Sequence, residues 1–145
     1  MKAVVQRVRT ARVLVDGAVV GEIGMGLCIF VGVAHDDGPE NSQRLARRVS
    51  RLRLFENEEG RLDRNVVESE GSALVVSQFT LLADTAKGNR PSFSAAARPE
   101  IAEPLYESFC DLLRADGVAV ERGVFGARML VEIANDGPLT ILLEA

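Results

Sequence analysis

The sequence has little of what metal and redox chemistry requires: one histidine, two cysteines and no tryptophan in 145 residues. A single histidine and dispersed carboxylates offer no ligand cluster of the kind that binds zinc or another transition metal. The cysteines, Cys28 and Cys110, lie in apolar segments at a spacing that matches no zinc motif. A free cysteine in such a setting behaves as a small hydrophobe. We therefore expect no metal and no cofactor.

Long apolar runs are also absent. The longest, Leu27–Val31, has the length of a strand, whereas a membrane-spanning helix needs about 20 apolar residues. The first residues, Ala3–Val8, are strand-like, and no separate hydrophobic region is followed by a small-residue cleavage site. We therefore expect no signal peptide. Two cysteines in apolar segments fit a reducing compartment, so we expect a cytoplasmic protein that does not contact a membrane.

Positive charge is scarce as well. Lysine and arginine number 17 against 21 aspartates and glutamates, a net charge of −4, which is the wrong sign for holding nucleic acid by overall electrostatics. Any RNA contact must come from a local patch. The candidates for phosphate contact are four arginines on one face of a predicted helix and two cations in a later loop: Arg44, Arg47, Arg48, Arg51, Lys87 and Arg90. A solvated helix face explains the four arginines equally well.

Conventional hydrolase machinery is missing too. His35 lies at the end of a predicted buried strand beside two aspartates, and no Gly-x-Ser-x-Gly motif accompanies it. A histidine in such a turn is more often solvated than catalytic. The glycines between Gly21 and Gly26 do not separate a strand from a helix, so they form no phosphate-binding loop. An enzyme with this inventory must rely on positioning and backbone donors, which suffice for hydrolysis of an activated ester.

The composition that remains is that of a globular domain, with 47% hydrophobic and 26% charged residues. Helical spacing of apolar residues predicts one helix that Asp36–Pro39 opens, with proline in its first turn, and a second at about 99–115. Apolar runs predict strands at residues 2–9, 12–15, 18–21, 27–33, 53–55, 72–79, 118–124, 128–134 and 139–144. The stretch 84–99 is typical of a functional loop. We expect one mixed α/β domain over residues 1–145, with more strands than helices.

Several short motifs occur in order along the whole chain. They are Gln6-Arg7-Val8, Gly24-Met25-Gly26-Leu27, Ser77-Gln78-Phe79-Thr80-Leu81, Ala83-Asp84, Gly88-Asn89-Arg90-Pro91-Ser92-Phe93 and Asn135-Asp136-Gly137-Pro138-Leu139-Thr140. In this order and in a chain of this length, the sequence resembles the D-aminoacyl-tRNA deacylase family. The resemblance implies a barrel-like fold with mixed and antiparallel sheets, α/β/β layers and two main helices. It also implies an enzyme that hydrolyses the ester of D-aminoacyl-tRNA for chiral proofreading in translation.

The resemblance implies that Ser77–Thr80 line the pocket for the terminal adenosine and its aminoacyl ester. We expect the backbone N–H groups of Phe79 and Thr80 to be the catalytic oxyanion donors, with the Thr80 hydroxyl as an accessory, because no base is identifiable nearby. A neighbouring ribose hydroxyl of the tRNA would help to activate water. Ser77 and Gln78 would bind substrate, and Phe93 and Met129 would contribute to the pocket wall. For Phe79, the residues alone favour packing in the core over stacking on a base.

Gly137-Pro138 taken alone predicts an ordinary turn, because few X-Pro bonds are cis. The resemblance implies instead a cis peptide whose carbonyl oxygens enter the pocket of a second subunit in a homodimer. There they would reject an L side chain, whereas a D side chain points away and glycine, without a side chain, escapes. Glycyl-tRNA is therefore a plausible secondary substrate. Arg7 would anchor this motif. Leu139 is a mild departure from the family, in which valine or phenylalanine is more common.

Three other interpretations remain open. A non-catalytic dimer could bind tRNA ends without cleaving the ester. A structural or scaffolding dimer would explain the strand-rich core and the sparse catalytic inventory. A hydrolase that uses Thr80 as its nucleophile is the mechanistic alternative.

Overall fold

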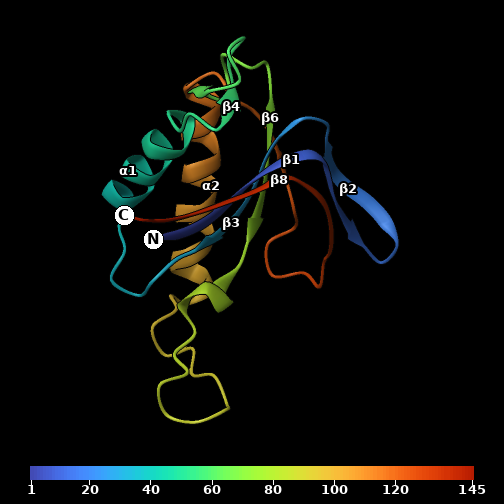
Figure 1. Ribbon diagram of the computed structural model, residues 1–145. Coiled ribbons are helices and arrows are strands. Elements are labelled where there is room, and N and C mark those ends of the chain that lie inside the picture. Colours follow the sequence, from blue (N-terminus) through green and yellow to red (C-terminus); the bar gives the residue numbers. More distant parts are fainter.

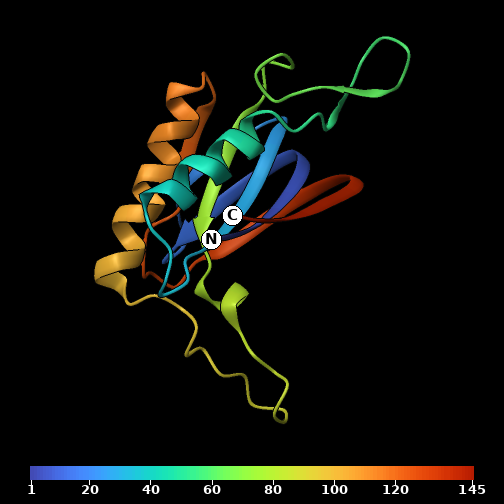
Figure 2. The same cartoon turned by 90° about the vertical axis from the view of Figure 1, so that its left-hand side faces the viewer.

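The computed structural model describes residues 1–145, and two helices cover one face of a strongly curved sheet (Figures 1 and 2). The strands are β1 (Lys2–Val15), β2 (Ala18–Ile23), β3 (Gly26–Gly32), β4 (Phe55–Glu56), β5 (Leu62–Arg64), β6 (Ser72–Ser77), β7 (Ala119–Arg122) and β8 (Leu130–Glu144). The helices are α1 (Pro39–Ser50), the 3-10 helix η1 (Phe79–Leu82) and α2 (Pro99–Ala115). No helix is long and apolar enough to cross a bilayer.

The main sheet has the order β2-β1-β3-β6-β7. Strands β2 and β3 pair with different parts of one edge of the long strand β1, and β8 pairs with its other edge. The pairs β3–β6 and β6–β7 are parallel, and the others are antiparallel. Strands β1 and β8 bend together, so that the sheet curls into a nearly closed, barrel-like form (Figure 2). The predicted α/β fold with two main helices and mixed sheets is confirmed.

Apolar residues fill both faces of the central strand β3, as its continuous apolar run predicted. On one face, Leu27 and Ile29 pack in a cluster with the helical residues Leu45 and Phe109. On the other, Cys28 packs inside the curl of the sheet in a cluster that includes Val8, Val13, Leu74 and Val76. Both cysteines are fully buried, and burial raises the pKa of the Cys28 thiol to about 12 and that of Cys110 to about 11. They act as small apolar side chains, as predicted.

Several predicted strand boundaries were wrong. Segments 2–9 and 12–15 are one strand, β1, and segments 128–134 and 139–144 are one strand, β8. Register shifts in the β1–β8 pair let both strands continue through irregular positions that look like breaks in the sequence. Strand β6 ends at Ser77 rather than residue 79, because Phe79 begins η1. The strand predicted at 53–55 is Phe55–Glu56, which pairs with β5.

Candidate active site

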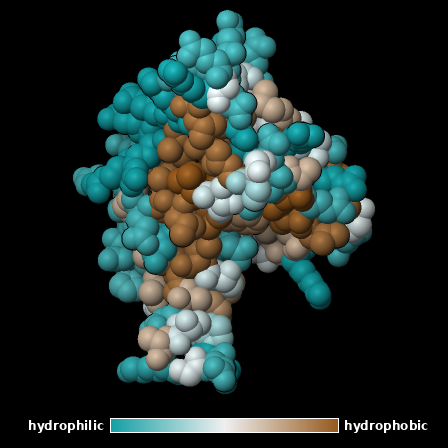
Figure 3. Space-filling model, viewed as in Figure 1, coloured by the Kyte–Doolittle hydropathy of each residue, from teal (hydrophilic) through white to brown (hydrophobic).

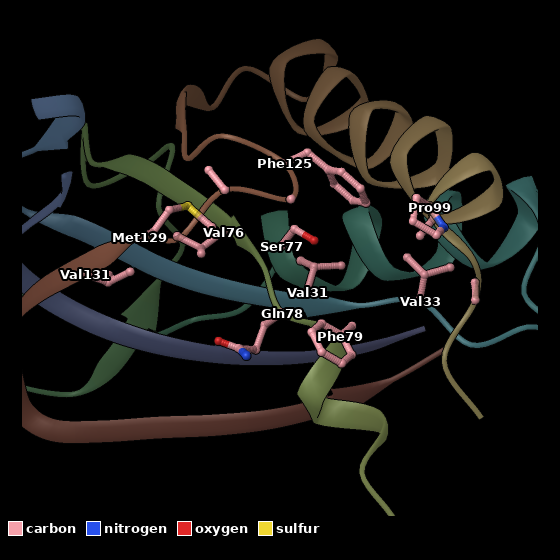
Figure 4. A pocket seen from close by; sticks show the side chains of 14 residues that line it. Val31, Val33, Val76, Ser77, Gln78, Phe79, Pro99, Phe125, Met129 and Val131 are labelled. Atoms are coloured by element: carbon pink, nitrogen blue, oxygen red, sulfur yellow. The ribbon is translucent and has the colours of Figure 1, made fainter. Parts of the chain in front are cut away.

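A cavity of about 540 Å³ opens where β6 ends (Figure 4). Strand β7 pairs with β6 only from Ser72 to Val75, so the last residues of β6 have a free edge. The first turn of α2 and the segment 123–129 close around that edge. The lining residues are Val31, Val33, Val76, Ser77, Gln78, Phe79, Ala97, Pro99, Ala102, Phe125, Gly126, Ala127, Met129 and Val131. None of these side chains titrates, so the cavity is apolar with a few neutral polar groups.

Ser77, Gln78 and Phe79 form one wall of the cavity, at the end of β6 and the start of η1 (Figure 4). The expectation that Phe79 packs in the core was wrong: 55% of this residue is exposed. Its ring meets that of Phe93 edge-to-face, with centroids 5.0 Å apart. The chain turns into η1 at this point, which moves Phe79 out of the row of buried valines. An exposed ring held by a second ring can stack on a planar ligand.

The backbone at this wall has N–H groups available to a ligand. The N–H of Gln78 donates to the carbonyl of Val31 at 2.8 Å, and that of Leu81 donates to the carbonyl of Gln78 at 3.2 Å. Between them, Phe79 and Thr80 are the first residues of η1, and the first N–H groups of a helix have no partner within it. Neither N–H donates to another backbone carbonyl. They are the two groups predicted from the sequence as oxyanion donors; Phe79 lines the cavity, whereas Thr80 lies next to it in η1 and is not among the lining residues.

Thr80 is exposed, and its hydroxyl accepts a hydrogen bond from the side-chain amide of Gln78. No histidine, carboxylate or lysine lines the cavity to remove a proton from that hydroxyl. His35 lies outside the cavity, with its side chain 64% exposed and its ring nitrogen Nδ1 3.9 Å from Asp36 Oδ1. The arrangement therefore favours polarisation by backbone donors over attack by a side-chain nucleophile.

Gly137 and Pro138 lie in a bulge of β8 and are both exposed. Their peptide bond is cis, and Gly137 has a φ of +124°. Opposite Gln6 stands Thr140, and opposite Val8 stands Asn135. The four residues 136–139 therefore face Arg7 alone and have no partners of their own in β1.

The Arg7 side chain lies against this bulge and is only 11% exposed. Its Nε donates to the carbonyl of Asp136 at 3.3 Å, and its Nη1 donates to the carbonyl of Leu54 at 2.8 Å. A Cβ on Gly137 would lie 3.3 Å from Arg7 Nη2 and 3.1 Å from the nitrogen of Leu139. Both the positive φ and these close contacts select glycine at this position.

Within one chain the two motifs are far apart. Val131 lines the cavity, whereas Gly137 lies six residues further along β8, which corresponds to about 20 Å of extended strand. The structure thus brings Ser77, Gln78, Phe79 and Met129 together, with Phe93 against Phe79. It does not bring Arg7, Gly137 or Pro138 to the same cavity.

The predicted phosphate contacts fall in two places. Arg44, Arg47 and Arg48 are exposed on α1, and Arg51 follows its last residue. This helix contributes no residue to the cavity, and Arg48 donates to the carbonyl of Glu144. Lys87 and Arg90 lie in the exposed segment that carries Phe93.

Sequence reasoning missed the opposite wall of the cavity, which includes Pro99, Ala102 and Phe125. It also missed Arg98 and Arg128, two exposed cations adjacent in the chain to lining residues. Neither forms a salt bridge. These residues come from segments that are distant in sequence, and only the order of the strands brings them to the end of β6.

Comparison with solved structures shows the same fold. A structure named "c-Myc DNA Unwinding Element Binding Protein" superposes with a TM-score of 0.93 at 42% identity, and the match covers 100% of this chain and 99% of that one. A second, described as "Structural Analysis of a probable eukaryotic D-amino acid tRNA deacylase", gives a TM-score of 0.86 at 18% identity over 99% of this chain and 98% of that one. At that identity the second match supports the fold alone.

Comparison of sequences identifies the family. D-aminoacyl-tRNA deacylase of Anaeromyxobacter dehalogenans is 55% identical over 145 residues, which cover 100% of this chain and 97% of that protein. D-aminoacyl-tRNA deacylase of Opitutus terrae is 53% identical over 146 residues, with coverage of 100% and 97%. The family model for D-Tyr-tRNA(Tyr) deacylase matches residues 4–144. The chain therefore belongs to the D-Tyr-tRNA(Tyr) deacylase family.

Proposed function

We propose that this protein hydrolyses the ester of D-aminoacyl-tRNA to free tRNA and a D-amino acid. Its family and the names of its relatives support this reaction. The observation that carries the proposal is the cavity itself: it has a size typical of small-ligand pockets, an apolar lining and no titratable side chain. Such a site suits a neutral nucleoside and an ester that is already activated.

The proposed chemistry needs little from side chains. Water attacks the ester carbonyl, and the N–H groups of Phe79 and Thr80 stabilise the oxyanion that forms. The bond from the carbonyl carbon to the ribose oxygen then breaks. The ribose oxygen leaves with one proton of the attacking water, the other proton passes to solvent, and the amino acid leaves as a carboxylate. A neighbouring ribose hydroxyl of the tRNA assists the water, while the Thr80 hydroxyl, bonded to Gln78, orients the wall.

We further propose that the active site is completed in a homodimer. Gly137 and Pro138 are exposed and about 20 Å along β8 from the cavity of their own chain, so they are available to a second subunit. There their carbonyl oxygens would meet the substrate near its α-carbon and exclude an L side chain. A glycyl ester would pass this filter.

An apolar outer face supports the dimer. Leu142 of β8 is 76% exposed, and with Val4 and Leu81 it borders a shallow hollow on the surface. Figure 3 shows apolar surface across the middle of the face on which β8 lies in Figure 1. A monomer rarely exposes a continuous apolar area of this kind unless it binds another surface.

The phosphates of the acceptor end would meet cations at the rim of the cavity. Lys87, Arg90, Arg98 and Arg128 are exposed beside the lining or in the segment of Phe93. The arginines of α1 and of the residue after it, Arg44, Arg47, Arg48 and Arg51, would lie further along the RNA. With a net charge of −4, such local patches must supply the attraction.

The test is turnover of D-aminoacyl-tRNA and its L counterpart at catalytic concentrations of protein. We expect many cycles on the D ester and slow or no cleavage of the L ester. The structural relative named for binding a DNA element favours one other candidate, a nucleic-acid-binding protein without catalysis. That protein would protect the D ester from spontaneous hydrolysis. Such protection, with no turnover, would contradict the proposed function.

A further inference from the structure

The bulge of β8 is joined to the sheet at a neck, which we define as Gln6, Asn135 and Thr140. Asn135 and Thr140 are the last paired residues on either side of the bulge, and Gln6 stands opposite Thr140 in β1. The Thr140 hydroxyl accepts a hydrogen bond from Gln6 Nε2 at 3.2 Å and another from Asn135 Nδ2 at 3.4 Å. One hydroxyl oxygen therefore links both ends of the bulge to each other and to β1.

The orientation of the Asn135 side chain supports a dedicated role for this link. Its Oδ1 is buried and has no hydrogen-bond partner in the chain, so the bond to Thr140 is the one hydrogen bond of that amide. Leaving a buried acceptor without a partner is unfavourable. The Thr140 hydroxyl is therefore the one group that bonds the Asn135 side chain in this orientation.

The opposite side of the bulge is fixed by charge. Asp136 Oδ1 lies 3.2 Å from Arg9 Nε, and Asp136 Oδ2 lies 3.5 Å from Arg7 Nε. The bulge is thus fixed at Asp136 by two arginines and at Thr140 by two amides. Between these points the peptide groups of residues 137–139 lack ladder partners in β1, so their direction depends on the two attachments.

We propose that the neck is a positioning element that sets the direction of the Gly137 and Pro138 carbonyls and so sets the preference for D over L substrates. The inference rests on the proposed function, in which those carbonyls form the chirality filter. Gln6, Asn135 and Thr140 do not touch the substrate. They act because a filter made of backbone atoms discriminates only if it is held to within about 0.5 Å.

The test compares Thr140→Val, which removes the acceptor at nearly the same volume, with Thr140→Ser, which keeps it. The readout is kcat/KM for a D-aminoacyl-tRNA and its L counterpart. Thr140→Val removes the acceptor of both hydrogen bonds. We expect the D:L ratio to fall by at least about threefold to tenfold, the range given by the loss of a single neutral hydrogen bond, while cleavage of the D ester is nearly unchanged. Thr140→Ser should restore the ratio of the parent protein.

Gln6→Met provides an independent variant should Thr140→Val fail to fold, and it carries the same expectation. A folded Thr140→Val or Gln6→Met protein whose D:L ratio falls by less than threefold would overturn the inference, as would Thr140→Ser behaving like Thr140→Val. If the parent protein does not turn over D-aminoacyl-tRNA, the proposed function fails. If the parent protein does turn over D-aminoacyl-tRNA but the neck variants leave the D:L ratio unchanged, the proposed function stands and the proposed role of the neck is wrong.

Discussion

The cavity at the end of β6 and the bulge in β8 are both places where a strand stops pairing, yet they differ in almost every other respect. The cavity is concave, apolar and free of titratable side chains. The bulge is exposed and is held from behind by Arg7 and Arg9. A concave apolar site receives a ligand, whereas a rigid convex segment can only present its backbone to something else. Under the proposed function the cavity binds the substrate and the bulge selects it, and the two regions of one chain would meet only through a second subunit.

We expect the largest effect from a variant that disrupts the bulge and leaves the cavity intact. Gly137→Val places a side chain at a positive φ and against Arg7 and Leu139, so the bulge must move. We expect cleavage of L-aminoacyl-tRNA to rise about 100-fold, close to 3 kcal/mol in the activation barrier, with the D ester still cleaved. Parallel kinetics on both esters measure this change.

Gly17→Val is the matched control, because Gly17 also has a positive φ, of +80°, but its Cβ would meet nothing within 4 Å. It carries a comparable backbone cost in the β1–β2 turn. Equal loss of discrimination in both variants, or strict rejection of L esters by folded Gly137→Val, would remove the bulge from the selection step.

We expect the next largest effect from a variant that alters the cavity and leaves the bulge intact. Phe79→Ala removes an exposed ring that lies against Phe93. Loss of one base–aromatic stack weakens binding by about 1–3 kcal/mol, so we expect kcat/KM for the D ester to fall roughly 10- to 100-fold with an unchanged D:L ratio. Leu62→Ala, which removes another exposed apolar side chain at 48% exposure, should have no effect. A shift in the D:L ratio would show that the two regions are not separate.

A smaller effect distinguishes backbone donors from a side-chain nucleophile. Thr80→Ala removes the hydroxyl that Gln78 contacts but keeps the N–H. For an accessory hydroxyl we expect a loss of kcat below about tenfold, measured under single-turnover conditions. Complete loss of turnover by a folded Thr80→Ala protein would instead support Thr80 as the nucleophile.

The smallest effects concern the basic rim. Arg98→Ala and Arg128→Ala should each raise KM by about threefold. Each should also make the slope of log affinity against log salt concentration shallower by about 0.7–0.9 per lost phosphate contact. Arg12→Ala is the control: its guanidinium is already paired with Glu132, which raises its pKa. Measurements of KM between low and moderate salt concentration compare the three variants. An equal change in Arg12→Ala would mean that overall charge, rather than the rim, attracts the RNA.

The sequence predicted the wall of the cavity at the end of β6, but not the opposite wall. Ser77, Gln78 and Phe79 are contiguous and stand at the end of a readable strand, so local pattern and family resemblance located them. Pro99, Ala102 and Phe125 are small or apolar residues in separate segments, and nothing local distinguishes them from core residues. The exposure of Phe79 was also unpredictable, because it depends on a 3-10 turn that begins at Phe79, the last residue of the apparent strand.

The continuity of β1 and β8 was missed for a related reason. Proline and glycine ordinarily end a strand, and the pairing that holds β8 on both sides of residues 136–139 is supplied by a strand more than 120 residues away in sequence. Long-range pairing of this kind has no local signature.

The most direct test of the separation is a crystal structure of the protein with a non-hydrolysable D-aminoacyl-adenosine analogue. We expect the adenosine in the cavity beside Phe79 and the α-carbon of the amino acid against the carbonyl oxygens of Gly137 and Pro138 of the partner subunit. An analogue bound in the cavity with its amino acid in contact with one chain alone would contradict a site shared between subunits.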